Sequence, residues 1–406
     1  MTRVKPLHSL RYLAAFRCVA DACVDTCCAG LRVTVDRVSL DRLEALTSDG
    51  DPLQVEAHLE RGGAHAPPEA AATIRARADG ACPFLDPRRL CGLQQRYGPA
   101  GLGDACAQFP RATRAGSEVD EVAGSLACPE IVRLLLTTED PLAWVEVGPD
   151  SLPRRPALKA APTPSEARLE PFHQALTRGL LQHETPLAAR WLLAGELCVE
   201  LGAAGSAPWD GERLAVLRPR WEVHPAQERV ARTRRLLSTL ELPLEKFLEL
   251  FAGLIADRMS RPHAPRLAAR VESVGPLSGW RERFATSQRL LEDPIRIRLE
   301  RNLSLAAVNG LLRTPVALAG DPGRTLGTAM ACSALAAVML TLELAGTGAA
   351  QERVDACSVE TLQVLAKYVE KDPAFHARVA SLFDVPAEDR LTRMLLLALL
   401  FPRHGG

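Results

Sequence analysis

Aromatic residues are scarce in this chain of 406 residues, at 4% of the total, and no charge dominates, since lysine plus arginine equals aspartate plus glutamate at 49 each. A net charge of zero exerts no long-range attraction on nucleic acid or on an anionic membrane. Few aromatic side chains also mean few stacking platforms for single-stranded nucleic acid. We therefore expect neither nucleic acid nor a membrane among the partners of this protein.

Long apolar runs are lacking as well. The longest, residues 329–342, is too short to span a bilayer and is followed directly by Glu343, so we expect a buried helix there. Near the start of the chain, His8 and Arg11 interrupt the apolar residues early, which predicts that no secretion signal is present. These patterns together predict a cytoplasmic protein, in which thiols stay reduced.

Several sequence signatures of ligand binding are missing. No G-x-G-x-x-G turn follows a strand and opens a helix, which argues against a doubly wound nucleotide-binding fold. No C-x2-C pair is present, which weakens a zinc-ribbon interpretation. The C-x3-C-x2-C pattern of the common radical enzymes is absent too, because Cys28 follows Cys27 directly.

Cysteine, by contrast, is abundant and unevenly placed. Eight of the eleven cysteines lie in the first third of the chain; they are Cys18, Cys23, Cys27, Cys28, Cys82, Cys91, Cys106 and Cys128. Thiols at this density are either oxidised to disulfides or bound to metal. The odd total and the expected reducing compartment favour metal. Cys198, Cys332 and Cys357 lie in apolar helical stretches, where we expect them to be small buried hydrophobic side chains.

Eight thiols are enough for two four-cysteine sites, or for one cluster with further reactive or structural cysteines. A helical turn would place Cys23 and Cys27 on one face, and Cys18 could join them from the preceding segment. Cys27 and Cys28 are adjacent and their side chains diverge, so we do not expect both to bind one iron atom. Spacing alone leaves iron–sulfur and zinc open, and scattered buried cysteines without metal are the third interpretation.

The pattern of hydrophobic residues and prolines divides the chain into three parts. Residues 1–140 form a cysteine-rich metal-cluster module, in which Leu31, Val33 and Val35 alternate with polar residues as in a short half-buried strand. Six prolines mark a linker over residues 141–166. Apolar residues recur at helical spacing through residues 167–406. The predicted fold is mainly α, with a small irregular cysteine-rich N-terminal module followed by an all-helical domain.

Two local predictions follow inside the module. Ser39 is expected to be the N-cap of a helix that ends at Leu46. Residues 50–68 are polar and contain paired glycines and paired prolines, so they are predicted to be a loop. A further helix is predicted over residues 131–136, directly behind Cys128.

The cysteines belong to longer motifs that keep a recognisable order. These are FRC at residues 16–18, ACVDTCCAG at 22–30, V-x-V-D at 33–36, CPFL at 82–85, LC at 90–91, C-x2-FPR at 106–111 and SLACPE at 125–130. In order and spacing they resemble the flagellin lysine N-methylases, over about the first third of the chain. Residues 299–303 and 367–376 are similar to the helical C-terminal part of that family.

The resemblance implies an enzyme, an N-methyltransferase with a [4Fe-4S] cluster held by these cysteines. It also implies S-adenosylmethionine as methyl donor and a lysine ε-amine of a protein or peptide as acceptor. Two residues depart from the family pattern: Leu31 stands where members usually carry Trp, and residues 301–303 replace a Glu-Asn-Tyr-like run. These departures point to a changed acceptor pocket.

Methyl transfer to an amine requires the neutral amine, so the site has to lower the pKa of the lysine or take up its proton. Asp25, Asp36 and Glu130 lie within or beside the cysteine motifs and are the candidate catalytic carboxylates. Each has a structural alternative, as a turn cap, a strand end or a residue in the first turn of a helix. Arg111 is the candidate for binding the carboxylate of the methyl donor, with a surface or capping role as its alternative.

Two other functions stay open at this stage. A cluster enzyme could modify a small-molecule acceptor in a biosynthetic pathway. A non-catalytic metal-binding module could use its metal as a folding staple or to recruit a partner. The size of the helical part favours an enzyme over a bare staple.

Overall fold

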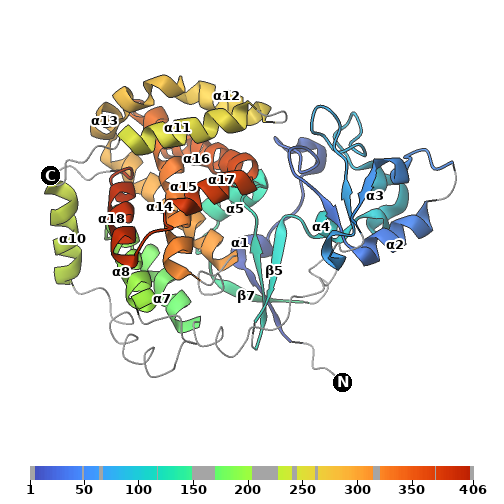
Figure 1. Cartoon of the computed structure of the whole chain (residues 1–406), viewed down its shortest axis with the longest axis horizontal. Helices are drawn as coiled ribbons and strands as arrows, with labels where there is room; N and C mark the ends of the chain where they lie inside the picture. The colour runs from blue at the N-terminus through green and yellow to red at the C-terminus, as the bar shows by residue number, and fades with distance from the viewer. Residues whose placement is uncertain are drawn as a thin grey trace.

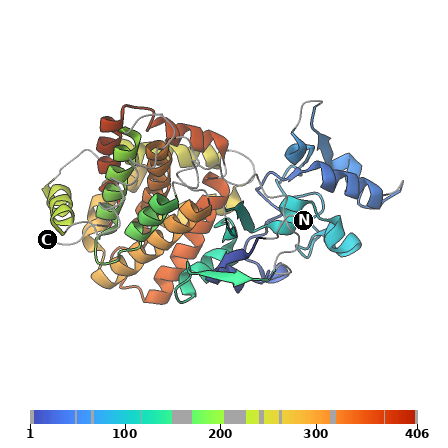
Figure 2. The same cartoon turned by 90° about the horizontal axis from the view of Figure 1, so that it is seen from below.

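The computed structural model describes residues 5–47, 50–63, 67–116, 118–148, 170–203, 227–239, 245–260, 264–313, 321–370 and 372–402. The fold is mainly α with two small sheets, as the sequence predicts. Residues 17–110, called the cysteine lobe below, lie at one end of the molecule (Figure 1). The helices from residue 170 onward, called the helical body, form the other end, and the view from below shows the same division (Figure 2).

In the described part of the chain, seven short strands form the two sheets. They are β1 (Leu7–Leu10), β2 (Thr34–Val35), β3 (Leu59–Arg61), β4 (Ala72–Ile74), β5 (Arg111–Ala115), β6 (Asp120–Gly124) and β7 (Trp144–Val147). The larger sheet has the order β5-β6-β1-β7, with β1 parallel to β6 and antiparallel to β7. The smaller sheet has the order β2-β4-β3 and is antiparallel. The larger sheet lies between the helical body and the cysteine lobe (Figure 1).

Helices build the rest of the molecule. Those in the first half of the chain are α1 (Arg11–Ala14), α2 (Arg37–Leu46), α3 (Gly92–Tyr97), α4 (Asp104–Gln108), α5 (Pro129–Thr137), α7 (Glu170–Leu180) and α8 (Leu187–Ala203). Those in the second half are α10 (Gln227–Thr239), α11 (Glu245–Met259), α12 (Pro265–Val274), α13 (Trp280–Leu290), α14 (Asp293–Arg313), α15 (Pro322–Leu344), α16 (Gln351–Val364), α17 (Pro373–Ser381) and α18 (Ala387–Ala398). A π-helical turn, Leu365–Val369, continues α16.

Two apolar cores hold these elements together. The larger core runs from β1, β6 and α5 into the helical body, where it includes most of α14 and α15. The smaller core belongs to the cysteine lobe and packs β2, β3 and β4 on α2 and α3. Among the described helices, α15 is long and apolar enough to cross a membrane, but 78% of its most apolar window is buried inside the protein. It is the buried helix predicted from residues 329–342.

The structure differs from the sequence predictions in three local features. β7 falls inside the predicted linker 141–166, because it pairs with β1; residues 149–166 lie outside the described residues. Asp36, rather than Ser39, is the N-cap of α2, since its carboxylate accepts a hydrogen bond from the Ser39 amide at 2.8 Å. The predicted loop 50–68 contains β3, which gains its partner β4 only through the fold.

The larger core also joins β6 and α5 to α14, across the predicted boundary between module and helical domain.

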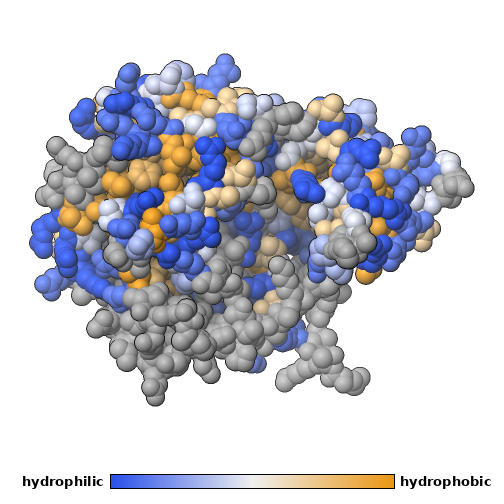
Figure 3. Space-filling view, in the orientation of Figure 1, coloured by the Kyte–Doolittle hydropathy of each residue, from blue (hydrophilic) through white to orange (hydrophobic). Residues whose placement is uncertain are grey.

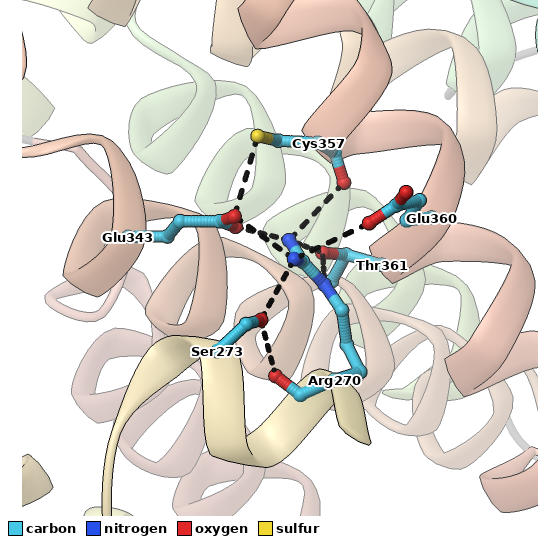
Figure 4. Close-up of polar contacts among 6 residues, drawn as sticks. All are labelled: Arg270, Ser273, Glu343, Cys357, Glu360 and Thr361. Atoms are coloured by element: carbon cyan, nitrogen blue, oxygen red, sulfur yellow. Dashed lines mark hydrogen bonds and ion pairs between the residues drawn. The ribbon is translucent and has the colours of Figure 1, made fainter. Parts of the chain in front are cut away.

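A buried polar cluster ties α12 to α15 and α16 inside the helical body (Figure 4). Arg270 of α12 is 5% exposed, and its guanidinium donates to Glu343 Oε1 at 2.9 Å and to Thr361 Oγ1 at 2.9 Å. The Cys357 thiol donates to the same Glu343 oxygen at 3.3 Å. Cys357 is therefore buried, as predicted, but it also acts as a hydrogen-bond donor to a buried carboxylate.

Candidate functional site

A cavity of about 770 Å³ lies between the cysteine lobe and the helical body. Five of the eight clustered cysteines line it: Cys27, Cys28, Cys82, Cys91 and Cys106. The helical body contributes Arg258 of α11, Lys367 and Tyr368 of the π turn, and Asp372. The space-filling view shows a hollow between the two parts, with apolar side chains at its edge (Figure 3). Clefts between two parts of a protein are common ligand sites, and we call this one the cysteine cavity.

Backbone pairing brings these distant cysteines to one cavity. The Cys82 amide donates to the Cys28 carbonyl at 2.6 Å, so the two motifs lie side by side. A bridge between Leu85 and Cys91 turns the chain back, and Cys91 becomes the residue that precedes α3. Cys106 comes from the short helix α4. The loop between Cys28 and Cys106 therefore folds around the site, which spacing along the sequence does not reveal.

The other three cysteines, Cys18, Cys23 and Cys128, do not line the cavity but lie near one another or near Cys27. Burial raises the pKa of Cys128 to about 12, and the nearby Cys23 and Cys27 thiols add to that rise. Burial also raises the pKa of Cys23; a hydrogen bond to the Asp25 carbonyl opposes this rise, and the charges of Asp25, Cys18 and Cys27 add to it. Cys27 is thus close to both groups and connects them.

All eight cysteines are free thiols in this structure. Within the described residues, no three His, Cys, Asp or Glu side chains are arranged as a ready-made metal site. The donor chemistry still suits a soft metal or an iron–sulfur cluster, because both prefer thiolate ligands. Burial raises the pKa of Cys82 to about 11 and of Cys106 to about 12, so metal binding would have to release these protons.

Cys27 differs from its neighbours in its protonation. A hydrogen bond from Cys28, opposed by burial and supported by the charge of Lys367, lowers the pKa of Cys27 to about 7. The same hydrogen bond and burial raise the pKa of Cys28. Cys27 is therefore the thiol in the cavity that most readily becomes a thiolate, which is the form that binds metal.

Asp25, the first candidate carboxylate, is buried and held by side chains from the helical body. Lys367 Nζ forms an ion pair with Asp25 Oδ2 at 2.8 Å, and the two side chains are 1% and 6% exposed. Gln363 Nε2 donates to the same oxygen at 2.8 Å. The Tyr368 hydroxyl donates to the carboxylate at 3.4 Å. Lys367 also donates to the Thr26 carbonyl at 2.8 Å, so the loop between Cys23 and Cys27 is anchored on the π turn.

The π turn is what presents Lys367 and Tyr368 to the cysteine cavity. It follows α16 without a break, and the wider turn changes which residues face the cysteine lobe. Such π turns inside α-helices occur frequently at functional sites. Burial lowers the pKa of Lys367, although Asp25 opposes this effect. The sequence analysis missed Lys367 as a site residue. The signal that could have found it is a lysine within an apolar helical run, because lysine is almost never buried without a partner.

The other two candidate carboxylates do not join Asp25. Asp36 caps α2, and Glu130 forms a two-pronged pair with Arg133 in the first turn of α5, at 2.6 Å and 2.8 Å. Neither lines the cysteine cavity. Asp36 thus lies at a helix cap and Glu130 in a first helical turn, and a catalytic role of either residue stays a prediction.

Arg111, the candidate ligand of the methyl donor, lies on β5 with its guanidinium 5.1 Å from the centre of the Phe16 ring. Burial and the nearby Arg17 lower the pKa of Arg111, while the Cys18 and Cys128 thiols oppose this. Arg111 is therefore on the side of Cys18 and Cys128, away from the cysteine cavity. Its role toward a methyl donor stays a prediction.

Comparison with known proteins finds relatives that carry related names. A lysine-N-methylase of Salmonella choleraesuis (strain SC-B67) is 30% identical over 139 residues, which is 33% of this chain and 33% of that protein. The lysine-N-methylase of Salmonella typhimurium (strain LT2) gives the same identity and coverage. The flagellar biosynthetic protein FliU of Salmonella muenchen is 30% identical over 143 residues, 33% of this chain and 79% of that protein. No family model and no solved structure matches the chain.

The structure and these relatives define a class of protein in which a cysteine-rich segment is docked on a helical body. The chain belongs, as a distant member, to the family that contains FliU and the lysine-N-methylases. The matched stretch spans about a third of the length of the lysine-N-methylases.

Proposed function

We propose that this chain is a cytoplasmic, iron–sulfur-cluster-dependent methyltransferase that uses S-adenosylmethionine and acts on a lysine ε-amine of a protein or peptide. The observation that carries the proposal is the cysteine cavity, where five free thiols face Lys367 and Tyr368 across the space between the two parts of the molecule. The likeness to proteins named lysine-N-methylase supports the type of reaction and the acceptor.

The cysteine side chains are the proposed ligands of a [4Fe-4S] cluster. Those that line the cavity would hold it there, starting from Cys27, whose pKa of about 7 makes it the readiest thiolate. Cys18, Cys23 and Cys128 would supply a remaining ligand or a second site. When bound, such a cluster supplies iron coordination positions and redox chemistry beside the methyl donor.

The cavity walls favour the neutral form of an acceptor amine in two ways. Leu31, Val33, Ile74 and other apolar side chains line the cavity, and an apolar environment lowers the pKa of an amine. Lys367 adds a positive charge at the wall, which further disfavours a second ammonium group nearby. Both effects lower the pKa of an entering lysine. Its amine then loses a proton more easily, and the neutral amine has the lone pair that accepts the methyl group.

Asp25 has a positioning role in this proposal. It does not line the cavity but lies behind Lys367 and Tyr368 and holds both. Loss of Asp25 would free the Lys367 ammonium and release the loop between Cys23 and Cys27. We therefore expect Asp25 to act on the reaction through these neighbours and not as a base that touches the substrate.

Anaerobic purification tests the cofactor. A brown protein with about four irons per cluster and broad visible absorption is the expected result. Cys27→Ser should lower both the iron content and the absorption, whereas Cys332→Ser, which removes a thiol far from the cluster, should leave them unchanged. A colourless protein with stoichiometric zinc would overturn the proposal and support the metal-binding module. If Cys332→Ser bleaches the protein, the assignment of ligands is wrong.

Labelled S-adenosylmethionine tests the acceptor. Incubation of the brown protein with the donor and a cell extract should transfer label to lysine in protein, read by acid hydrolysis and amino-acid analysis. Label only in small molecules would support the alternative acceptor. Leu31 supports a small-molecule acceptor, because it lines the cavity at a position where family members usually carry the larger Trp and therefore changes the shape of the acceptor pocket.

A further inference from the structure

A second cavity, of about 520 Å³, is lined mostly by the helical body and partly by Ser125 and Leu126, which lie between β6 and α5, and by none of the clustered cysteines. It is lined by α14, α15, α17 and the π turn, and α15 packs against both α14 and α17. The labels of these three helices lie close together in Figure 1. Much of its lining consists of small side chains, including Ala306, Gly310, Ala329, Ala336, Ala366 and Ala380. The volume falls within the range of pockets that bind small molecules. We call it the helical cavity.

The helical cavity lies on the opposite side of the π turn from the cysteine cavity. Leu365 and Ala366 line the helical cavity, whereas the next two residues, Lys367 and Tyr368, line the cysteine cavity. None of the eight clustered cysteines lines the helical cavity. The two cavities are therefore separate sites that share one structural element.

Two hydroxyl groups at the helical cavity lack a hydrogen-bond partner in the part of the chain that the structure describes. Ser125 is 6% exposed, and its Oγ is buried and unpaired. Ser333 Oγ is likewise buried and unpaired. Buried hydroxyl groups in native proteins are normally hydrogen-bonded. Since both serines line the cavity, a ligand with polar groups in its body could satisfy them.

One charged side chain at the helical cavity has no partner among the residues that the structure describes. Arg313, at the end of α14, lines the cavity and forms no hydrogen bond or ion pair with the described residues. Asp321 and Arg324 also line it, but each is already paired, at 2.8 Å, with a residue of the α17–α18 region. Glu370 and His376 have interactions of their own. The helical cavity can therefore accept an anionic group, which would pair with Arg313.

We propose that the helical cavity binds a small amphipathic carboxylate. The small apolar side chains would surround its hydrocarbon body, Ser125 and Ser333 would pair with polar groups along that body, and the guanidinium of Arg313 would bind the carboxylate. This site is independent of the proposed methyl transfer, because no clustered cysteine and neither Lys367 nor Tyr368 takes part in it.

Three probes with the same body test the charge preference, measured by calorimetric titration of the full-length protein. Octanoate tests the carboxylate and the hydrocarbon body alone, without polar groups for Ser125 and Ser333; it should bind at one site, and octan-1-ol should bind at least about tenfold more weakly. Octylamine should be weaker still, because Arg313 repels it. Arg313→Gln should weaken octanoate about tenfold and leave octan-1-ol unchanged.

A pair of glycine variants locates the binding. A Cβ at Gly310 of α14 meets no atom within 4 Å, so the side chain of Gly310→Leu can enter the helical cavity without a backbone clash. That variant should lose octanoate binding. Gly253→Leu is the matched control, because Gly253 lies on an exposed part of α11 and its Cβ also meets nothing within 4 Å. It should bind octanoate like the wild type.

Several results would overturn the proposal. Equal binding of all three probes, or octanoate binding that survives Gly310→Leu, would show that the carboxylate and the cavity are not involved. Failure of octanoate to bind at all would do the same. Binding of S-adenosylmethionine that Gly310→Leu abolishes, without binding of octanoate, would assign the cavity to the methyl donor instead. None of these titrations depends on iron or on methyl transfer, so the outcome is separate from that of the proposed function.

Discussion

The ammonium of Lys367 lies 2.8 Å from the carboxylate of Asp25, and both side chains are almost completely buried. The pair joins the loop between Cys23 and Cys27 to the π turn of the helical body. A buried ion pair is a weak source of net stability, because both charges lose their hydration. Removal of one partner lowers the stability strongly, because the other charge then stays buried without a partner. The ion pair therefore holds the cysteine lobe against the helical body, next to the cysteine cavity.

Lys367→Met should therefore destabilise the protein strongly. The variant leaves the Asp25 carboxylate without its cation, which should lower the free energy of unfolding by about 3–5 kcal/mol. The double variant Asp25→Asn with Lys367→Met should cost less than the sum of the two single variants, because no lone charge remains. Denaturant unfolding of the four proteins measures both effects. A cost below about 1 kcal/mol for Lys367→Met would show that the pair is open to water.

The cluster in Figure 4 allows a comparison within one network. Arg270→Met leaves Glu343, whose side chain is 13% exposed, without its cation, and should cost about 3–5 kcal/mol of unfolding free energy. Glu360→Gln removes a carboxylate that is 57% exposed and pairs with the same arginine at 3.5 Å, and it should cost less than about 1 kcal/mol. Thermal and denaturant unfolding would measure the difference. Equal costs would contradict the burial that the structure assigns to this cluster.

Close packing of α15 against the segment after α17 predicts a small-to-large effect. A Cβ at Gly327 would lie 2.4 Å from the ring of Phe383, which is fully buried. Gly327→Ala should therefore lower the unfolding free energy by about 1–3 kcal/mol. Gly253→Ala, which meets no neighbour within 4 Å, should instead raise it, by up to about 1 kcal/mol, through helix propensity. If both variants are stabilising, the ring of Phe383 does not occupy the assigned position.

His173 of α7 predicts a loss of stability in mild acid. It is 2% exposed, and neither ring nitrogen has a hydrogen-bond partner among the described residues. Burial lowers the pKa of His173 from 6.5 to about 4. Between these two values the unfolded chain binds a proton that the folded protein does not, so stability falls as the pH drops through this range. The contribution is at most about 1.4 kcal/mol per pH unit.

The measurement is the unfolding free energy between pH 7 and pH 4 for the wild type and for His173→Leu. The variant should have the shallower slope, by the amount that one histidine contributes. His58→Gln, which changes a half-buried histidine of the cysteine lobe, is the control and should keep the steeper slope of the wild type. Parallel curves for all three proteins would mean that His173 has the same pKa in the folded and unfolded states.

Much of the fold could be predicted from the sequence because it depends on local patterns. Helical spacing of apolar residues predicted the helix behind Cys128 and the helices of the body, and the alternation around Val35 predicted β2. The N-cap of α2 was predicted less reliably, because Asp36 and Ser39 are both good caps. In the structure Asp36 is the cap. Six of the seven described strands, β1 and β3 to β7, were missed because a strand of three to five residues is defined by its pairing with another strand and not by its own sequence pattern.

For the site, the sequence by itself determined the number and order of the clustered cysteines, and their density predicted a metal site. It also identified Asp25 as a residue of interest. Only the tertiary structure decided which five cysteines share a cavity, that Lys367 faces them, and that a second cavity lies behind the same π turn. The physical reason is that thiol chemistry belongs to the residue, whereas cavities and buried ion pairs arise from contacts between segments that are hundreds of residues apart, and no local pattern encodes those contacts.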